Sequence, residues 1–157
     1  MDDSYPAWID YYCPKLYSFV FALLPDELQS KQLVIDSFSK IIMENQDLIS
    51  SIEEEESSSK KQLMLLLFSQ AFKLAKKRAY QLEGLLVDND LIDESNRTFY
   101  ESLNFEQRAV LFLSMQMNFS IENIMEIIRK KRFEVVELLH LSRNKLVAPI
   151  EHQQRVV

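Results

Sequence analysis

The chain has 157 residues and a net charge of −6, and 47% of its residues are hydrophobic. This length fits one domain or two small helical ones. A single glycine leaves little material for the hairpin turns of a β protein, so we expect an all-α fold. The lone Cys13 excludes a disulfide framework and is expected to be a buried free thiol in a reducing compartment.

The charges are distributed unevenly along the chain. Residues 1–56 hold 3 basic and 12 acidic side chains, whereas residues 57–87 hold 6 basic and 1 acidic. A locally positive segment can contact phosphates even in an acidic chain, although strong nucleic-acid binders are usually basic overall. The acidic start and the short apolar runs predict neither a secretion leader nor a membrane span. We therefore expect a cytoplasmic protein.

Two amphipathic helices are predicted at the start of the chain, over residues 8–24 and 28–45. Pro14 lies either in the first turns of the first helix or at a break between two shorter segments. Apolar residues recur at spacings of three and four in both helices, which predicts one buried face on each. These residues are Leu16, Phe19, Val20 and Leu23 in the first helix and Leu33, Val34, Phe38, Ile41 and Ile42 in the second.

A run of four acids and three serines, residues 53–59, is typical of a solvated loop or a frayed helix end. A more specific alternative is that these acids mimic the charge of DNA or shield the basic helix that follows them. That helix is predicted over residues 60–82, with Phe68 and Phe72 on its core face and Tyr80 as a further aromatic. Near its C-terminal end, four cations either complement the helix dipole or contact phosphates. They are Lys73, Lys76, Lys77 and Arg78.

The best domain boundary lies at residues 84–96, which contain the only glycine followed by polar and acidic residues. We predict a helical domain at 1–83, a linker at 84–98, a second helical domain at 99–149 and a tail at 150–157. The last helix is expected to end near Leu146, ahead of Pro149.

We predict three consecutive helices in the second domain. Asn104 and Gln107 form a capping pair before the first helix, and Ser120 can cap the second. A basic break at residues 129–132 leads into the third. A short capped helix, a tight break and a further helix are the pattern of a helix-turn-helix unit, which places one helix in the DNA major groove.

These segments resemble the extracytoplasmic-function sigma factors, the small promoter-specificity subunits of bacterial RNA polymerase. Residues 11–24 (YYCPKLYSFVFALL) and 33–42 (LVIDSFSKII) are similar to helices of sigma region 2, and residues 108–146 are similar to region 4. The resemblance implies that RNA polymerase core is a partner. It places the polymerase-binding surface at Gln32, Ile35, Asp36 and Ser39.

The resemblance also implies contacts with promoter DNA. The candidate residues are the cations of the two DNA-binding regions: Lys73, Lys76, Lys77, Arg78, Arg129, Lys130, Lys131, Arg132, Arg143 and Lys145. However, Arg129 stands at the turn glycine of the family. Val136, Glu137 and Leu138 stand where the family has a Lys-Ser-Arg group that faces DNA. Base edges are read by hydrogen-bond donors and acceptors, and this strip supplies a single acceptor. We therefore expect weak promoter recognition and interpret the strip as a contact patch for a protein partner.

No catalytic or metal-binding motif is recognisable in the sequence. The two histidines, His140 and His152, are far apart, one cysteine cannot complete a zinc site, and one glycine excludes a glycine-rich phosphate loop. We expect a protein that is not an enzyme and has no cofactor, metal or small-molecule substrate.

Three functions remain open. The favoured one is a sigma-factor-like transcription protein that binds RNA polymerase core, an anti-sigma factor or both, with weakened promoter recognition. The alternatives are a working alternative sigma factor and a helical interaction module outside transcription.

Overall fold

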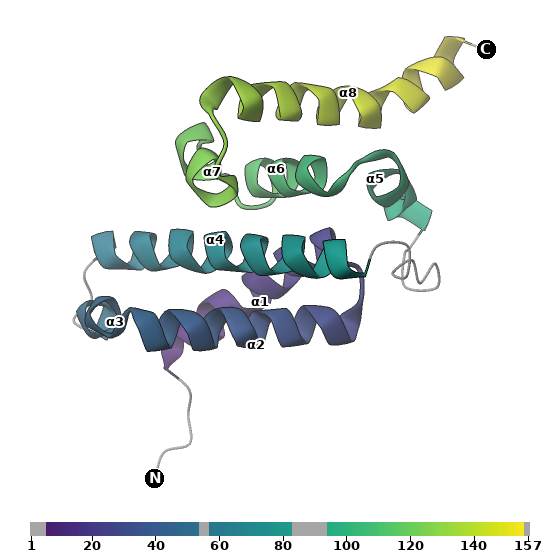
Figure 1. The fold of residues 1–157 in the computed structure, drawn as a ribbon. Helices are drawn as coiled ribbons and strands as arrows, with labels where there is room; N and C mark the ends of the chain where they lie inside the picture. The colour runs from purple at the N-terminus through teal and green to yellow at the C-terminus, as the bar shows by residue number, and fades with distance from the viewer. Residues whose placement is uncertain (1–5, 54–56, 83–93, 156–157) are drawn as a thin grey trace.

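The computed structural model describes residues 6–53, 57–82 and 94–155, and all elements within these ranges are helices (Figure 1). In chain order they are α1 (Ala7–Leu23), α2 (Glu27–Glu44), α3 (Gln46–Glu53), α4 (Ser57–Gln81), the 3-10 helix η2 (Glu94–Asn96), α5 (Arg97–Ser102), α6 (Phe105–Met115), α7 (Ile121–Ile128) and α8 (Arg132–Arg155). The prediction of an all-α fold is confirmed. Most of the predicted linker, and residues 54–56 of the acidic run, lie outside the described residues.

The first two helices follow the predicted periodicity closely. α1 is one helix with Pro14 inside it, rather than two short segments. Asp26 caps α2, because its carboxylate accepts a hydrogen bond from the backbone N–H of Gln29 at 2.8 Å. Cys13 is half-buried against the core rather than fully enclosed. The short helix α3 was not expected from the sequence.

The core is a single hydrophobic cluster that draws side chains from both predicted domains. Phe19 of α1 lies 5.1 Å from Phe68 of α4 and 5.6 Å from Phe112 of α6, measured between ring centroids. Phe68 in turn meets the edge of Phe119 at 5.4 Å. Phe68 and Phe72 are both buried, as their helical spacing predicted. The segments on either side of residues 84–98 therefore share one core.

α4 is the central helix of the molecule. It packs against α1, α2 and α3 on one side and against α7 on the other, while α6 packs against α1 (Figure 1). α8 forms the outermost layer and covers α6 and α7. Every helix in the described ranges is too short or too polar to cross a membrane. This arrangement brings the C-terminal half of α4 close to the end of α7.

The second half contains the predicted caps. Asn104 and Gln107 form a complete capping box at the start of α6, and Ser120 caps α7. α8 differs from the prediction, because it continues past Pro149 to Arg155 instead of ending near Leu146. Pro149 therefore lies inside α8, as Pro14 lies inside α1, although a proline in a helix interior removes one backbone hydrogen bond and crowds the carbonyl four residues earlier.

Candidate functional site

A groove of about 820 Å³ lies between the C-terminal half of α4 and the C-terminal end of α7. We call it the α4–α7 groove. It unites two basic segments that the sequence analysis placed in separate domains, and its lining includes five of the ten predicted DNA-contacting cations. Its lining residues are Ser69, Phe72, Lys73, Lys76, Lys77, Tyr80, Gln81, Ile127, Ile128, Arg129 and Lys130.

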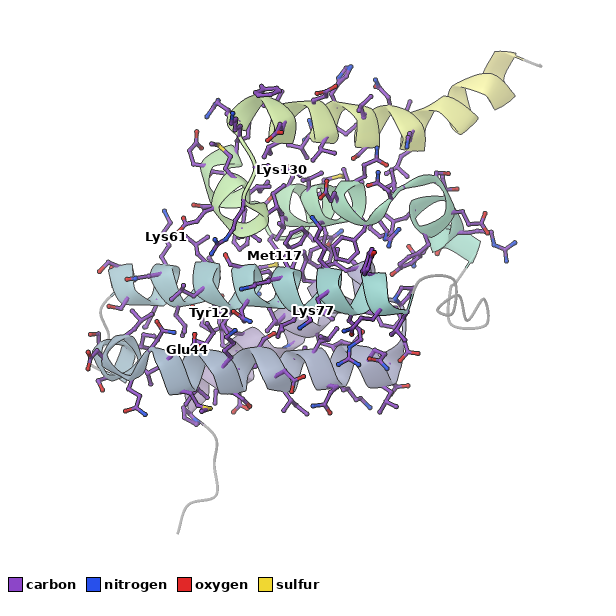
Figure 2. All side chains as sticks on the ribbon, viewed as in Figure 1. Tyr12, Glu44, Lys61, Lys77, Met117 and Lys130 are labelled. Atoms are coloured by element: carbon purple, nitrogen blue, oxygen red, sulfur yellow. The ribbon has the colours of Figure 1, made fainter. Side chains whose placement is uncertain are left out.

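The α4 wall of the groove follows from helical spacing. Lys73, Lys77 and Tyr80 recur at intervals of four and three, so they share one face of the helix. Residues such as Ala71 and Ala75 occupy the opposite face and are fully buried. Tyr80 is 81% exposed, which leaves its ring free to pack against a ligand. Lys77 projects from α4 in Figure 2.

The α7 wall combines an apolar floor with a cationic end. Ile127 and Ile128 are buried and line the groove with hydrocarbon. Arg129 ends the helix in the left-handed conformation, with φ 55° and ψ 51°, and its N–H donates to the carbonyl of Met125. Lys130 follows immediately and donates its own N–H to the same carbonyl at 3.3 Å (Figure 2). The turn therefore presents two adjacent cations to α4.

Glu106, near the start of α6, joins the two walls. One carboxylate oxygen lies 2.9 Å from the Lys76 ammonium, and the other lies 3.4 Å from the Lys130 ammonium. Burial alone would raise the pKa of Glu106, but Lys76 and Lys130 together hold it below the ordinary value. Among the described residues, no carboxylate pairs with Lys73, Lys77 or Arg129. Three cations in the groove are thus available to an anion.

The other predicted DNA-contacting cations do not line the groove. Arg132 pairs with Glu122 of α7. Arg143 lies 3.5 Å from the Ser114 hydroxyl, and Lys145 donates to the Gln107 side chain at 3.0 Å. Lys131 is exposed at the start of α8, and Arg78 is half-buried near the end of α4. These residues lie on α4, on α8 and in the turn just before α8.

The predicted polymerase-binding residues lie on the outer face of α2. Ile35 is 57% exposed, Gln32 and Ser39 are exposed, and the Gln32 amide donates to the Asp36 carboxylate at 2.9 Å. Leu28 and Met43 lie on the same face and are 74% and 77% exposed. These two apolar residues were not among the predicted polymerase-binding residues. Their spacing of seven and eight residues from Ile35, opposite the buried set of α2, is the signal that would have found them.

The strip predicted as a partner contact is partly exposed. Val136 and Glu137 face solvent on α8, whereas Leu138 is half-buried and packs against the core. Phe133, one turn earlier, is also exposed. Of the three positions expected to face DNA, α8 therefore presents one apolar side chain and one acid to solvent.

No protein-family model matches the chain, and no curated protein does. In the part of the chain that the structure describes, no group of three or more histidine, cysteine or acidic side chains is placed to hold a metal ion. The α4–α7 groove offers cations, hydrocarbon and one exposed aromatic ring, which suits binding of an anionic, partly aromatic ligand.

Proposed function

We propose that this chain is a sigma-factor-like transcription protein that docks on RNA polymerase core through α2 and contacts promoter DNA only weakly. The observation that carries this proposal is the exposed apolar face of α2. Leu28, Ile35 and Met43 project from a helix whose opposite face is buried, and polar Gln32 and Ser39 lie between them. The resemblance to the extracytoplasmic-function sigma factors assigns polymerase binding to this same segment.

The packing and capping of α2 favour a docking role. The helix is held by its Asp26 cap and by buried contacts along its length, including Leu33, Phe38 and Ile41. A surface that is already ordered loses little conformational entropy when it binds. An apolar stripe along one face is the pattern by which helices pack against partner helices. Asp36, oriented by Gln32, adds a charge at the edge of the stripe.

The proposed weak binding of promoter DNA rests on the side chains of α8 and on Glu106. Val136 and Glu137 offer no donors to base edges, and the carboxylate repels phosphates. Two of the cations expected to contact DNA, Lys76 and Lys130, are already engaged by Glu106. The remaining cations support salt-sensitive, sequence-independent contacts with DNA.

Binding of the purified chain to bacterial RNA polymerase core tests the docking surface. Ile35→Glu should weaken binding about tenfold or more, because it places a charge in the centre of an apolar contact. Val147→Glu is the matched control, since it makes the same kind of change at an exposed position on α8. Equal affinities of the two variants, or no binding by the unaltered chain, would show the docking assignment to be wrong.

A second measurement tests the proposed weak binding of DNA. Duplexes of differing sequence, with and without polymerase core, are titrated at two salt concentrations. We expect weak binding that falls steeply with salt and shows little preference among sequences. Strong, sequence-selective binding with polymerase would instead indicate a working alternative sigma factor.

A further inference from the structure

We propose that the α4–α7 groove binds a free nucleoside polyphosphate, with its phosphates on Lys73, Lys77 and Arg129 and its base against Tyr80. This ligand site is separate from the α2 surface and does not depend on polymerase binding. It exists only where α4 and α7 lie together, so neither predicted domain would form it alone.

The phosphate end of the site is set by the three cations without a carboxylate partner. Lys73 and Lys77 lie one helical turn apart on α4, and Arg129 approaches from the end of α7. Cations from two helices can surround a polyphosphate, and an arginine guanidinium can hold two phosphate oxygens at once. Glu106 already neutralises part of the charge of Lys76 and Lys130, which leaves the positive potential concentrated on the other three.

The base end of the site is set by Tyr80. Its ring is exposed and borders both the groove and a smaller adjoining pocket lined by Ala79, Asn104 and Glu106. Planar bases stack on exposed aromatic rings in nucleic-acid-binding proteins. Seven residues separate Lys73 from Tyr80, a distance of about 10 Å along the helix axis. One nucleotide can therefore span the ring and the cations.

The size of the groove favours a small molecule over a long strand. Its volume of about 820 Å³ lies within the range of roughly 300–1,000 Å³ that is typical of ligand pockets.

A substitution at Arg129 can test ligand binding without disturbing the fold. It occupies a left-handed backbone conformation, which glycine adopts more easily than arginine. Arg129→Gly therefore removes the guanidinium without straining the turn. A loss of ligand binding in this variant cannot be attributed to unfolding, provided that its thermal midpoint is no lower than that of the unaltered chain.

The test is a titration of the whole chain with fluorescently labelled GTP and ATP at low salt. Arg129→Gly and the double change Lys73→Gln, Lys77→Gln should each weaken binding about tenfold or more, because each removes charged hydrogen-bond donors. Tyr80→Ala should weaken nucleotide binding and leave the affinity for inorganic triphosphate unchanged. Lys61→Gln, an exposed lysine at the far end of α4, is the matched control and should bind like the unaltered chain (Figure 2).

Three results would overturn the proposal. The first is no binding of either nucleotide, and the second is equal affinity in the Lys61 control and the Lys73, Lys77 double variant. The third is tighter binding of a single-stranded oligothymidine than of nucleotide through the same residues, which would assign the groove to nucleic acid. None of these results bears on polymerase docking, which the Ile35→Glu variant tests separately.

Discussion

The Lys76 ammonium lies 2.9 Å from the carboxylate of Glu106, 30 residues later in the chain. The same carboxylate lies 3.4 Å from Lys130, so one acid joins α4, α6 and the turn between α7 and α8. Both lysines were predicted to contact DNA from separate domains. Their shared partner ties these segments together beside the α4–α7 groove and removes two cations from the free surface.

Glu106→Gln should destabilise the chain at neutral pH by about 1 kcal/mol, the magnitude of partly exposed ion pairs. The pKa of Glu106 is lowered in the folded chain, so its stabilisation is present above the unfolded value of about 4.5 and is lost as pH falls through the lowered pKa. Urea denaturation over a series of pH values from 7 downwards measures this. The difference in free energy of unfolding between the variant and the unaltered chain should shrink as the pH falls.

Glu101→Gln is the control for this change. Glu101 makes a single exposed pair with Arg97 at 3.9 Å, so its loss should alter the free energy of unfolding by only a few tenths of a kcal/mol. Equal effects of the two substitutions would mean that Glu106 does not hold the helices together.

Arg108 provides a second link between the two segments. Its guanidinium donates to the carbonyls of Ala22 and Leu23 at 3.0 Å and of Leu103 at 2.7 Å. The two carbonyls of α1 lie at its C-terminal end, where carbonyls lack partners within the helix and a cation is favourable. Arg108→Ala should cost about 2–3 kcal/mol in the free energy of unfolding, because it leaves partly buried carbonyls unpaired.

Arg108→Lys distinguishes geometry from charge. Lysine retains the cation but cannot reach three carbonyls in the fixed fork of a guanidinium. It should recover less than half of the loss in the same denaturation experiment. Full recovery would show that the charge alone is sufficient.

Local features of the fold were predictable from the sequence because they depend on neighbours in the chain. The caps at Asn104 and Ser120 need only residues within one turn, and both are present. The buried faces of α1, α2 and α4 follow from helical spacing. The sharing of one core by the segments before and after residues 84–98 did not follow, because periodicity says which face of a helix is buried and not which helix covers it.

The candidate site was likewise not predictable from local sequence patterns, because it depends on which helices pack together. The sequence identified Lys73, Lys77 and Arg129 as candidate DNA-contacting cations, but their meeting in one groove depends on the packing of α4 against α7. Glu106 gave no signal, since a single acid near a helix start is common and complements the helix dipole. Its role follows only from the positions of two distant lysines.

Arg129→Gly should raise the stability of the fold. An L-residue in the left-handed region costs about 1–2 kcal/mol, while glycine costs about 0.5–1 kcal/mol more entropy on folding, so the net gain should be about 0.5–1 kcal/mol. Asn118, the other described residue with positive φ, is the matched control. Asparagine tolerates this conformation better, so Asn118→Gly should gain less. A lower thermal midpoint for Arg129→Gly would contradict this reasoning.

Glu137→Arg should increase the affinity of the chain for duplex DNA. Glu137 is exposed on α8, at a position predicted to face phosphates, and the change replaces a repelled carboxylate by a guanidinium. Each added phosphate contact should steepen the dependence of log affinity on log salt by about 1, because one more counterion is released. Fluorescence anisotropy of a labelled duplex over a series of salt concentrations measures both quantities.

Glu44→Arg provides the control for net charge, since Glu44 is exposed on α2, in the opposite layer from α8 (Figure 2). It alters the total charge equally, so any gain that comes from long-range attraction alone should be the same in both variants. A steeper salt dependence confined to Glu137→Arg would place DNA against α8. Equal slopes would mean that α8 does not approach the phosphates, and that the apolar strip around Val136 faces a different partner.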